Sequence, residues 1–348
     1  MPVEQGGVNE PTAAIAATTI IGADVGGTYA RLGWTTQRAG EPIRVNDFRR
    51  YACADHPSLA AILRDYTARL RDNPAIPPVN RAVVAIAGLL DGDRLLNTNL
   101  AWQVSLAQTR CEAGLAELEL INDFVAVAQA IPHVEPEALH LLSGDADHRP
   151  HGPALVLGPG TGLGVGGLLV RDGRCYPLAT EGGHASFAPT TPEQIRILEI
   201  LTQQFGRVSN ERLICGPGLV NLHRTLSEIA GLDPGQLQPP QVSERAAAGD
   251  PVAMRAIEVF MDIFGAVAGD AVLVQGAWDG VFLTGGLVPR LLGPLRHSGF
   301  RSHFENKGRF TATLSQVPSL AIVHPCPGLL GAAAYALDLE QAPTGASA

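Results

Sequence analysis

The chain has 348 residues, 46% of them hydrophobic, and its 34 acidic and 25 basic residues give a formal net charge of −9. Because single hydrophobic cores stop growing near ~250–300 residues, this length favours two domains that share a cleft. The cations do not cluster, which speaks against a nucleic-acid partner. Lys307 is the single lysine of the sequence, so a Walker-type phosphate loop and a protein-kinase Val-Ala-Ile-Lys element are excluded.

The sequence shows no signal for a membrane or a secretory pathway. No apolar run approaches the ~18 residues that a membrane-spanning helix needs. No basic region precedes the mildly apolar stretch at 13–21, so residues 1–17 are predicted to form a flexible tail and not a signal peptide. The five cysteines are scattered without a Cys-x-x-Cys pair, which is typical of reduced thiols in the cytosol. We therefore expect a cytoplasmic protein with no membrane partner.

The first half of the chain predicts alternating strands and helices. Residues 18–24 form a predicted buried strand closed by Gly26-Gly27, and residues 29–36 and 45–51 extend it into an antiparallel meander. Apolar residues near one face predict a helix over 58–71. The other elements predicted in this half are strands over 81–87 and 118–121 and a helix over 124–131. The last strand and helix place Asp123 at a strand-to-helix junction.

The second half repeats this scheme, because a strand, a glycine-rich turn and another strand occur again over 154–170. Residues 191–194 have the sequence of a capping box with proline at the first helical position. The helix that follows is predicted to carry Ile195, Leu198 and Leu201 on one apolar stripe. The remaining predicted elements are helices over 218–230, 251–275 and 329–339, a strand over 281–284 and a helix after Pro289.

A glycine turn follows the first predicted strand, in the sequence Asp24-Val25-Gly26-Gly27-Thr28. Glycine lets backbone N–H groups approach a triphosphate closely, and the hydroxyl of Thr28 can add a donor. Asp24 can hold Mg²⁺ directly or through water, since Mg²⁺ keeps several waters and takes one or two carboxylates. Taken alone, the same residues also fit an ordinary hairpin turn.

Six glycines stand among the ten residues 158–167, between two apolar predicted strands. Glycine loses more conformational entropy on folding than any other residue, so a plain hairpin would not need this many. A strand follows the run, which excludes a Rossmann fingerprint and leaves a ligand loop or a bulged flexible hairpin. A third turn, Gly285-Gly286, offers a flat surface for a purine or ribose, or a short strand-to-helix connection. Together the three turns predict a nucleotide held between two lobes.

Polar residues outside the glycine turns could bind a second, hydroxylated ligand. Glu181 and His184 flank two glycines and can converge on a small polyol, or they form an ordinary loop pair. Glu211 by itself fits a solvated helix start. Asp123 either caps its helix or accepts a hydroxyl proton. The helix N-terminus should keep Asp123 ionised and make it a weak base, which phosphoryl transfer tolerates.

Taken together in chain order, these residues resemble the bacterial glucokinase family, hexokinase-like enzymes of the actin/Hsp70/sugar-kinase superfamily. The resemblance runs from about residue 20 to residue 337. The motifs that carry it are 22–28, 121–124, 160–164, 181–184, 187–189, 209–212, 216–222, 285–290 and 328–331. Such a colinear set is specific, whereas any single motif would be weak.

The resemblance implies a two-lobed α/β fold of the actin-like ATPase (ribonuclease H-like) type, with a cleft between the lobes. It places residues 18–133 plus 326–348 in a small domain and residues 134–325 in a large one. The implied activity is ATP-dependent phosphorylation of D-glucose at the 6-hydroxyl, which yields glucose 6-phosphate at the start of glycolysis. The implied cofactors and partners are ATP, Mg²⁺ held at Asp24 through water, glucose and a second copy of the chain in a homodimer.

The resemblance also implies roles for individual residues. Asp123 matches the base that receives the proton of the sugar 6-hydroxyl. The residues matching ligands of the sugar are Asn99, Asn122, Asp123, Glu181, His184 and Glu211. The residues matching the nucleotide site are Asp24, Gly26, Gly27 and Thr28 in a first phosphate loop, Gly160, Thr161 and Gly162 in a second, and Gly285 and Gly286 beside adenosine.

Other functions on the same fold stay open at this point. A non-catalytic sugar or nucleotide sensor would not need Asp123 beside two phosphate loops. An actin-like or chaperone-like ATPase would not need the residues predicted to bind sugar. The sequence also leaves open whether another hexose is the substrate and whether ADP or polyphosphate is the phosphoryl donor.

Overall fold

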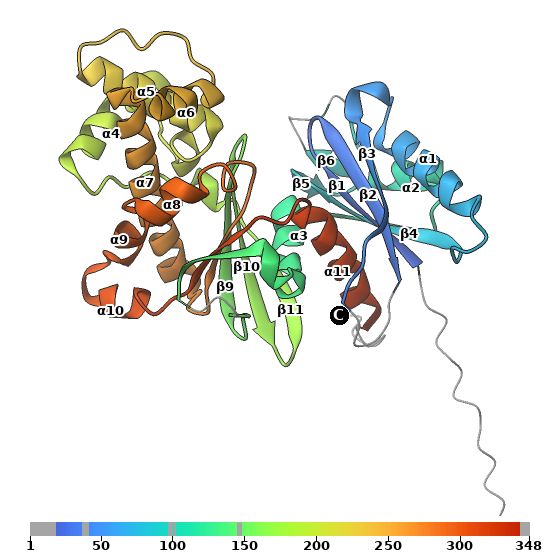
Figure 1. Cartoon of the computed structure of the whole chain (residues 1–348). Helices are drawn as coiled ribbons and strands as arrows, with labels where there is room; N and C mark the ends of the chain where they lie inside the picture. Colours follow the sequence, from blue (N-terminus) through green and yellow to red (C-terminus); the bar gives the residue numbers. More distant parts are fainter. Residues whose placement is uncertain (1–18, 37–41, 97–99, 101, 145–147, 342–348) are drawn as a thin grey trace, which may run out of the picture.

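The structure is a computed structural model that describes residues 19–36, 42–96, 100, 102–144 and 148–341. The described residues form two α/β lobes, each built on a twisted sheet, with two helices lying between the sheets (Figure 1). A small hairpin, β5 (Leu89–Asp91) with β6 (Arg94–Leu96), projects from the first lobe. Within the described residues, none of the helices combines the length and apolar composition that a membrane span requires.

The first sheet has the strand order β3-β2-β1-β4-β7. Its strands are β1 (Thr19–Val25), β2 (Tyr29–Thr36), β3 (Asn46–Ala52), β4 (Val79–Ile86) and β7 (Glu117–Ile121). β1, β2 and β3 form the predicted antiparallel meander, and β4 and β7 run parallel to β1. Because side chains alternate along a strand, Ile21 and Ala23 pack under one set of helices and Ile20 packs on the opposite face.

Helix α1 (Leu59–Arg71) covers one face of this sheet together with α2 (Leu106–Ala113). Ser58 caps α1 by accepting a hydrogen bond from the Ala61 N–H at 3.1 Å. The apolar face predicted for α1 is buried in the core of the lobe, with Tyr66 at its centre. α2 is a helix that the sequence pattern did not predict, and Ser105 caps it.

The second sheet has the strand order β11-β10-β9-β12-β13-β8. Its strands are β8 (Leu139–Ser143), β9 (Pro153–Pro159), β10 (Leu163–Arg171), β11 (Arg174–Ala179), β12 (Val281–Leu283) and β13 (Ser319–Ile322). β9, β10 and β11 are antiparallel, and β12 and β13 run parallel to β9. The second sheet therefore repeats the order of the first and adds β8 at one edge, which matches the duplication predicted from the sequence.

Helices cover the second sheet and extend the lobe away from the first. They are α4 (Pro192–Phe205), α5 (Gly216–Ile229), α6 (Pro239–Ala247), α7 (Pro251–Gln275), α8 (Leu292–His297), α9 (Phe300–Glu305) and α10 (Thr311–Leu314). α7 has the predicted bounds, because Asp250 caps its first turn and Gly276 ends it at a φ of 65°. Short 3-10 turns complete the chain: η1 (Cys53–Asp55), η2 (Ile131–His133), η3 (Pro136–Ala138), η4 (Gly182–His184), η5 (Asn210–Arg212) and η6 (Gly308–Phe310).

The apolar stripe predicted for α4 is wrong at Ile195 and confirmed at Leu198 and Leu201, which pack in the core of this lobe. Ile195 is 49% exposed, whereas Gln194, Ile197 and Leu201 are buried. The reason lies at the start of the helix: the Gln194 side chain accepts a hydrogen bond from the Thr190 N–H at 2.8 Å and not from the capping residue. Gln194 is thus turned inward, and the buried face follows it along the helix.

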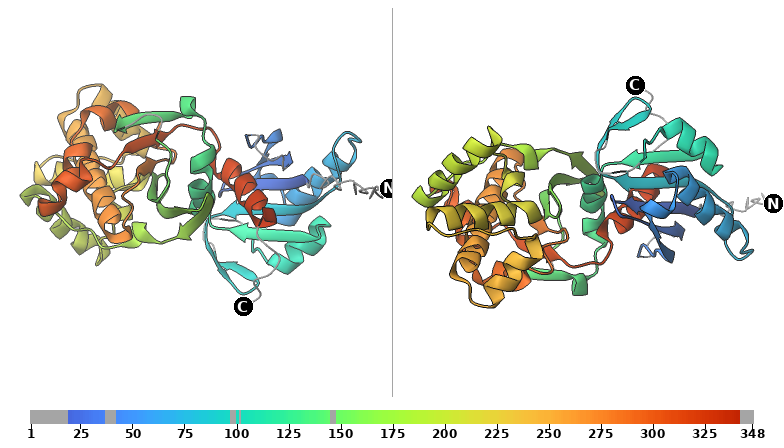
Figure 2. Two further views of the ribbon diagram at one scale, coloured as in Figure 1. Left: turned by 90° about the horizontal axis from the view of Figure 1, so that it is seen from below. Right: turned by 90° about the horizontal axis from the view of Figure 1, so that it is seen from above.

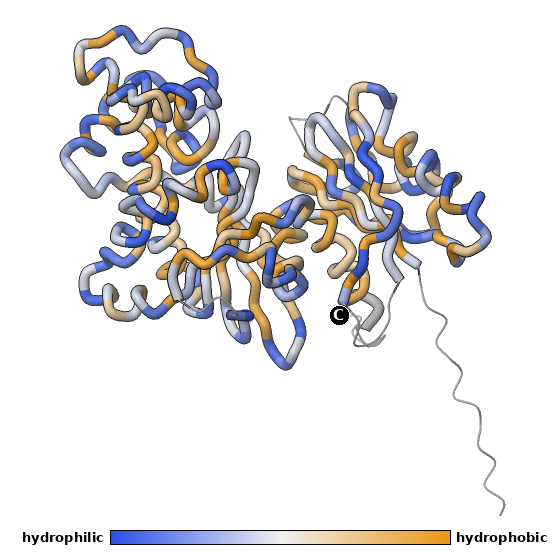
Figure 3. Tube along the Cα trace, in the orientation of Figure 1, coloured by the Kyte–Doolittle hydropathy of each residue, from blue (hydrophilic) through white to orange (hydrophobic). Residues whose placement is uncertain are grey.

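Helices α3 (Asp123–Ala130) and α11 (Pro327–Gln341) pack against each other between the two sheets (Figure 2). A Cβ atom on Gly331 would lie 1.6 Å from the Ala126 carbonyl oxygen, so glycine permits this close backbone contact. One side of α3 faces α11 and the first sheet, and its Val127 side joins the core of the second sheet. Hydrophobic residues are concentrated in this region (Figure 3). The domain boundaries predicted from the sequence stay a prediction.

Candidate active site

A cavity of about 440 Å³ lies between the lobes and brings most of the predicted site together. The predicted residues that line it are Gly26, Gly27, Asn122, Asp123, Gly160, Thr161, Gly162, Glu181, His184, Glu211 and Gly285. Asp24, Thr28 and Gly286 do not line it, and Asn99 lies outside the described residues. The lining residues come from both sheets and from α3, so the cavity exists only because the two lobes face each other.

Asn122 and Asp123 have different roles at the start of α3. Asn122 caps the helix, because its Oδ1 accepts hydrogen bonds from the N–H groups of Phe124 at 2.8 Å and Val125 at 3.3 Å. Asp123 lies in the first turn, and its Oδ1 accepts from the Phe124 N–H at 3.1 Å. Among the described residues, no side chain donates a hydrogen bond to the carboxylate of Asp123. The neighbouring Asn122 therefore does the capping, and Asp123 keeps an oxygen that can accept a proton.

The expectation that the helix terminus makes Asp123 a weak base is wrong. Burial, together with the negative charges of Asp24 and Glu181, raises the pKa of Asp123 to about 6. The N–H of Phe124 lowers this pKa but does not offset the loss of solvent. A carboxylate with a pKa nearer to neutrality accepts a proton more readily and is still ionised at pH 7.

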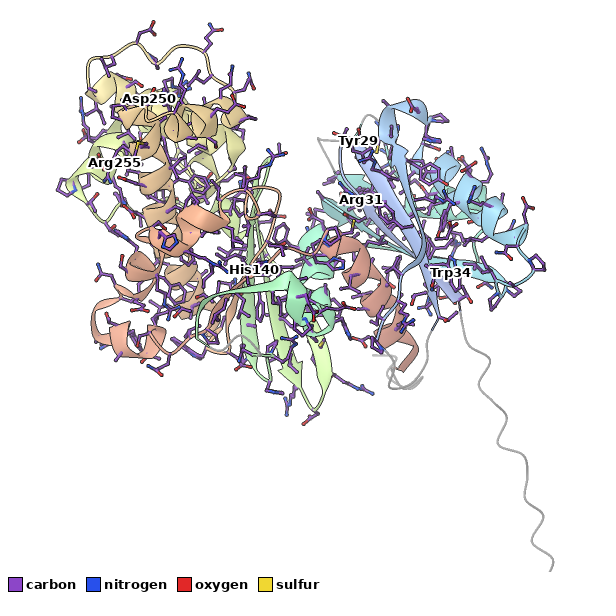
Figure 4. The ribbon with its side chains drawn as sticks, in the orientation of Figure 1. Tyr29, Arg31, Trp34, His140, Asp250 and Arg255 are labelled. Atoms are coloured by element: carbon purple, nitrogen blue, oxygen red, sulfur yellow. The ribbon has the colours of Figure 1, made fainter. Side chains whose placement is uncertain are left out.

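Asp24 lies behind the first glycine turn, at the end of β1. Arg31 is its direct partner in the β1–β2 ladder, and the Arg31 Nη1 lies 3.3 Å from Asp24 Oδ2. Burial raises the pKa of Asp24, and the charge of Arg31 lowers it. Figure 4 labels Arg31 on β2, with Tyr29 nearer the cleft end of the strand. The turn itself is short: the Gly26 N–H donates to the Tyr29 carbonyl at 3.0 Å.

The acidic residues at this end of the cleft fit a Mg²⁺ ion that is held mainly by phosphates. Asp24 and Asp123 lie close enough for the charge of one to raise the pKa of the other, and a cation between them would relieve this repulsion. Across the described ranges, no group of three His, Cys, Asp or Glu side chains could form a metal cage. Mg²⁺ beside a triphosphate needs only one or two carboxylates, so Asp24 suits such a site.

The second glycine turn is tied to the segment that carries Glu211. The Gly160 N–H donates to the Gly162 carbonyl at 2.8 Å, and the Gly216 N–H donates to the Gly160 carbonyl at 2.9 Å. The Leu163 N–H donates to Glu211 Oε2 at 2.9 Å. A Cβ atom on Gly162 would lie 2.4 Å from the same oxygen. Glu211 is therefore held against the turn by a backbone donor and by the small size of its neighbour.

Glu181 and His184 stand at the two ends of η4 and face the cavity. Their side chains are 73% and 59% exposed, with His184 Nε2 3.9 Å from Glu181 Oε2. A Cβ atom on Gly183 would lie 2.0 Å from the Leu163 carbonyl oxygen, so glycine lets η4 rest directly on β10. Both polar side chains line the cavity together with Glu211.

The third glycine turn touches the second. Gly285 has a φ of 90°, and a Cβ atom there would lie 2.6 Å from the Pro159 carbonyl oxygen. The Leu287 N–H also donates to the Pro159 carbonyl, at 3.2 Å. Gly285 therefore lines the cavity beside the second turn, whereas Gly286 is exposed outside it.

Comparisons with known proteins agree with this geometry. The family model described as "Glucokinase" matches residues 21–339. The chain belongs to the glucokinase family. It is 54% identical to the glucokinase of Stenotrophomonas maltophilia (strain K279a), over 94% of this chain and 98% of that protein. The family and the fold class predicted from the sequence are thereby confirmed.

Solved structures of similar proteins share the fold. The crystal structure of a glucokinase from an Antarctic psychrotroph is 31% identical, with a TM-score of 0.82, covering 91% of this chain and 98% of that one. A ROK family glucokinase from Streptomyces griseus, in complex with glucose and AMPPNP, has a TM-score of 0.57 at 21% identity, covering 91% and 98%. The likeness to the second structure concerns the fold alone.

Three features of this glucokinase-family site were not predicted from the sequence. They are the ion pair of Arg31 with Asp24, the Leu163 N–H that holds Glu211, and the ring of Phe124 beside the second turn. The first could have been found, because a hairpin closed at residues 26–29 places Asp24 opposite Arg31. The other two join segments far apart in the chain, and no local pattern indicates them.

Proposed function

We propose that this member of the glucokinase family transfers the γ-phosphoryl group of ATP to the 6-hydroxyl of D-glucose, with Asp123 as the general base. The class of reaction follows from the family and from the 54% identity over 94% of the chain, so the predicted glucokinase activity is confirmed at that level. The roles of the individual residues are our proposal.

One observation carries the proposal: Asp123 lines the same cavity as two glycine turns and as Glu181, His184 and Glu211. A sugar bound by the polar side chains would present its primary hydroxyl to Asp123. A triphosphate on the backbone N–H groups of the turns would present its terminal phosphoryl group to the same point. In-line transfer requires such an arrangement, because its loose transition state depends on positioning and charge neutralisation.

The residues of the chain would have the following roles in the reaction. The Asp123 carboxylate would take the proton of the 6-hydroxyl as the new O–P bond forms, while the bond from the γ-phosphorus to the bridging oxygen breaks and ADP leaves. The amides of Gly26, Gly27 and the 160–162 turn hold the phosphates, and the Asn122 amide nitrogen, His184 and Glu211 hold the other hydroxyls. Movement of the lobes toward each other would exclude water, which would otherwise compete with the sugar.

ATP and Mg²⁺ complete the proposed site. The Streptomyces griseus structure contains glucose and AMPPNP, which supports an adenine nucleotide as the donor. Asp24 would hold Mg²⁺ through water, and the ion would neutralise charge on the phosphates. Glycolysis, a cytoplasmic location and a homodimer stay predictions from the sequence and its family resemblance.

The test is ADP release by the purified protein with a panel of hexoses and phosphoryl donors. We expect turnover with glucose and ATP that depends on Mg²⁺, with glucose 6-phosphate as the product. Mannose, glucosamine and fructose measure the breadth of the sugar site, and ADP and polyphosphate measure the donor preference. Binding of sugar without ADP release would support the sensor. ATP hydrolysis at the full rate without sugar would support an ATPase.

A further inference from the structure

Phe124, the residue after the proposed base, lies against the hairpin formed by β9 and β10. A Cβ atom on Gly164 would lie 1.8 Å from Phe124 Cε2, and one on Gly158 would lie 2.6 Å from Phe124 Cζ. Carbon atoms that are not bonded do not approach so closely. Neither position can therefore carry a side chain while the ring stays in place.

The glycines under the ring form one continuous surface. Gly158 and Gly164 are direct partners in the β9–β10 ladder, and Gly166 follows two residues later on the same face. A Cβ atom on Gly166 would lie 3.2 Å from the Phe124 carbonyl oxygen and 3.5 Å from its Cβ. We call Gly158, Gly164 and Gly166 the glycine floor. The glycine floor contacts the whole of Phe124, from its backbone to its ring.

A methyl carbon of another residue lies against the glycine floor on each side. The methyl carbon of Thr284, which follows β12, would lie 3.0 Å from a Cβ on Gly158. Val156 Cγ1, on β9, would lie 3.1 Å from a Cβ on Gly166. Phe124 itself is partly buried and packs against the apolar core that includes Val156 and Leu168 of the second sheet. The ring of Phe124 therefore packs into a site that these residues shape, where the second sheet meets the cavity.

The same residue holds the proposed base. The N–H of Phe124 donates to Asn122 Oδ1 at 2.8 Å and to Asp123 Oδ1 at 3.1 Å. The position of this N–H depends on where the ring is seated. The floor in turn continues directly into the second glycine turn at residues 160–162. One side chain thus links the carboxylate of Asp123 to the turn proposed to bind phosphate.

We infer that Phe124 is a positioning residue: its ring, seated on the glycine floor, sets the place of Asp123 relative to the second phosphate turn. The inference rests on the proposed role of Asp123 as the base. Misplacement of reacting groups by ~1 Å can cost ~10²-fold in rate, so loss of the seat should lower kcat. Of the groups proposed to bind the sugar hydroxyls, Glu181, His184 and Glu211 stand at η4 and η5 and should keep their affinity.

The first experiment replaces the ring and measures ADP release at saturating glucose and ATP. We expect Phe124→Ala to lower kcat by ~10–10²-fold and to change the KM for glucose by less than ~3-fold, with Phe124→Leu between it and the wild type. Phe310→Ala is the matched control, because Phe310 is 37% exposed and stacks on Trp278 at the surface. Circular dichroism and thermal midpoints establish that each variant is folded, and Phe124→Leu carries the test if Phe124→Ala does not fold.

The second experiment adds a methyl group to the floor with and without the ring. In the wild type, Gly164→Ala should displace the ring and lower kcat by ~10-fold or more. In Phe124→Ala, the same substitution places its methyl in the vacant seat and should leave kcat unchanged or raise it. Gly293→Ala is the matched control, because the described residues place no atom within 4 Å of a Cβ there.

The outcomes separate the inference from the proposed function. Equal losses for Gly164→Ala in both backgrounds, or Phe124 variants with a kcat like that of Phe310→Ala, would overturn the positioning role. A rise in the KM for glucose with unchanged kcat would overturn it as well. Asp123→Asn is measured alongside. If Asp123→Asn keeps its turnover, the assignment of Asp123 as the base fails. If Asp123→Asn loses its turnover while the Phe124 variants stay fully active, only the role of Phe124 is refuted.

Discussion

The two glycine-rich segments at the cleft look alike in sequence but use glycine for different reasons. At the first turn, the nearest atom to a Cβ on Gly26 would be the Tyr29 carbonyl oxygen, at 3.8 Å, so the backbone is open to a ligand. In the second segment, Gly158, Gly164 and Gly166 seat Phe124 and Gly162 seats Glu211. Among the six glycines of residues 158–167, Gly160 alone would carry a Cβ that meets no described atom within 4 Å.

The difference teaches that a glycine count does not measure phosphate contact. The six glycines among residues 158–167 suggested a loop built around a ligand. Most of them bring two other chain segments close to the loop, with Gly167 beside Leu178 and Gln275. By this criterion the first turn is open at Gly26, as the proposed phosphate site requires, and the second segment is open at Gly160 and otherwise a packing surface. The following substitutions test that contrast.

Removal of the carboxylate of Asp123, the proposed base, should have the largest effect on activity. We expect Asp123→Asn to lower kcat by ~10²-fold or more, because general-base loss typically costs ~10²–10⁴-fold. Binding of ATP and glucose, measured by calorimetry, should change little if both turns act independently of the base. Since burial raises the pKa of Asp123, the ionised form is disfavoured in the folded protein. The variant should therefore melt at a higher temperature than the wild type at pH 8, and a lower midpoint there would contradict this.

The acidic residue of the first turn should come next. We expect Asp24→Asn to raise the concentration of free Mg²⁺ needed for half-maximal activity and to lower kcat by ~10–10²-fold, since the ion neutralises charge in transfer. The measurement is a titration of free Mg²⁺ at constant ATP. Asp65→Asn is a matched control, because Asp65 bonds Tyr51 at the surface. Identical Mg²⁺ curves for Asp24→Asn and wild type would remove Asp24 from the metal site.

The pH dependence of activity should show that the negative charge of Asp24 raises the pKa of Asp123. Asp123 has a pKa raised to about 6, and it must be ionised to accept a proton. Activity should therefore fall as the pH drops through about 6, by ~10-fold for each further unit. The charge of Asp24 contributes to the raised pKa, so Asp24→Asn should move this acid limb to lower pH. A limb that does not move in Asp24→Asn would show that the two carboxylates do not interact.

A methyl group in the packed part of the second segment should weaken sugar binding. A Cβ on Gly162 would lie 2.4 Å from Glu211 Oε2, so Gly162→Ala should push the carboxylate away from the Leu163 N–H. We expect the KM for glucose to rise by ~10-fold, about the loss of one charge-assisted hydrogen bond. Initial rates at varied glucose measure it. An unchanged KM for glucose would mean that Glu211 does not contact the sugar.

A methyl group at Gly160, where the second segment is open, should have the smallest effect on activity. Gly160→Ala meets no described atom within 4 Å, and its φ is not in the left-handed region. The free energy of unfolding should rise by ~0.4–1 kcal/mol, because alanine restricts the unfolded chain. The KM for ATP should rise only a few-fold, since the methyl faces the cavity. Urea unfolding and initial rates at varied ATP test both, and strong destabilisation would place Gly160 among the packed glycines.

The sequence by itself determined the strands, the long helices and the family. Alternating and continuous apolar runs predict β1, β2, β4, β9 and β12, and the Asp250 cap with its proline predicts α7. These features are local, because they depend on burial of one face and on chain geometry at a helix end. The short elements α2, β11 and β13 were not predicted, since their own sequences do not indicate them. Contacts stabilise them instead: α2 packs on α1, β11 pairs with β10, and β13 pairs with β12 and β8.

Only the tertiary structure decided the properties of the site. The charge state of Asp123 follows from how much water the two lobes exclude and from the distance to Asp24, neither of which a sequence motif contains. The purpose of each glycine follows from what lies opposite it: Phe124 and Glu211 reach the second segment from chain positions 30 or more residues away. Desolvation and close packing act through space, and for that reason they are fixed by the fold and not by the order of residues along the chain.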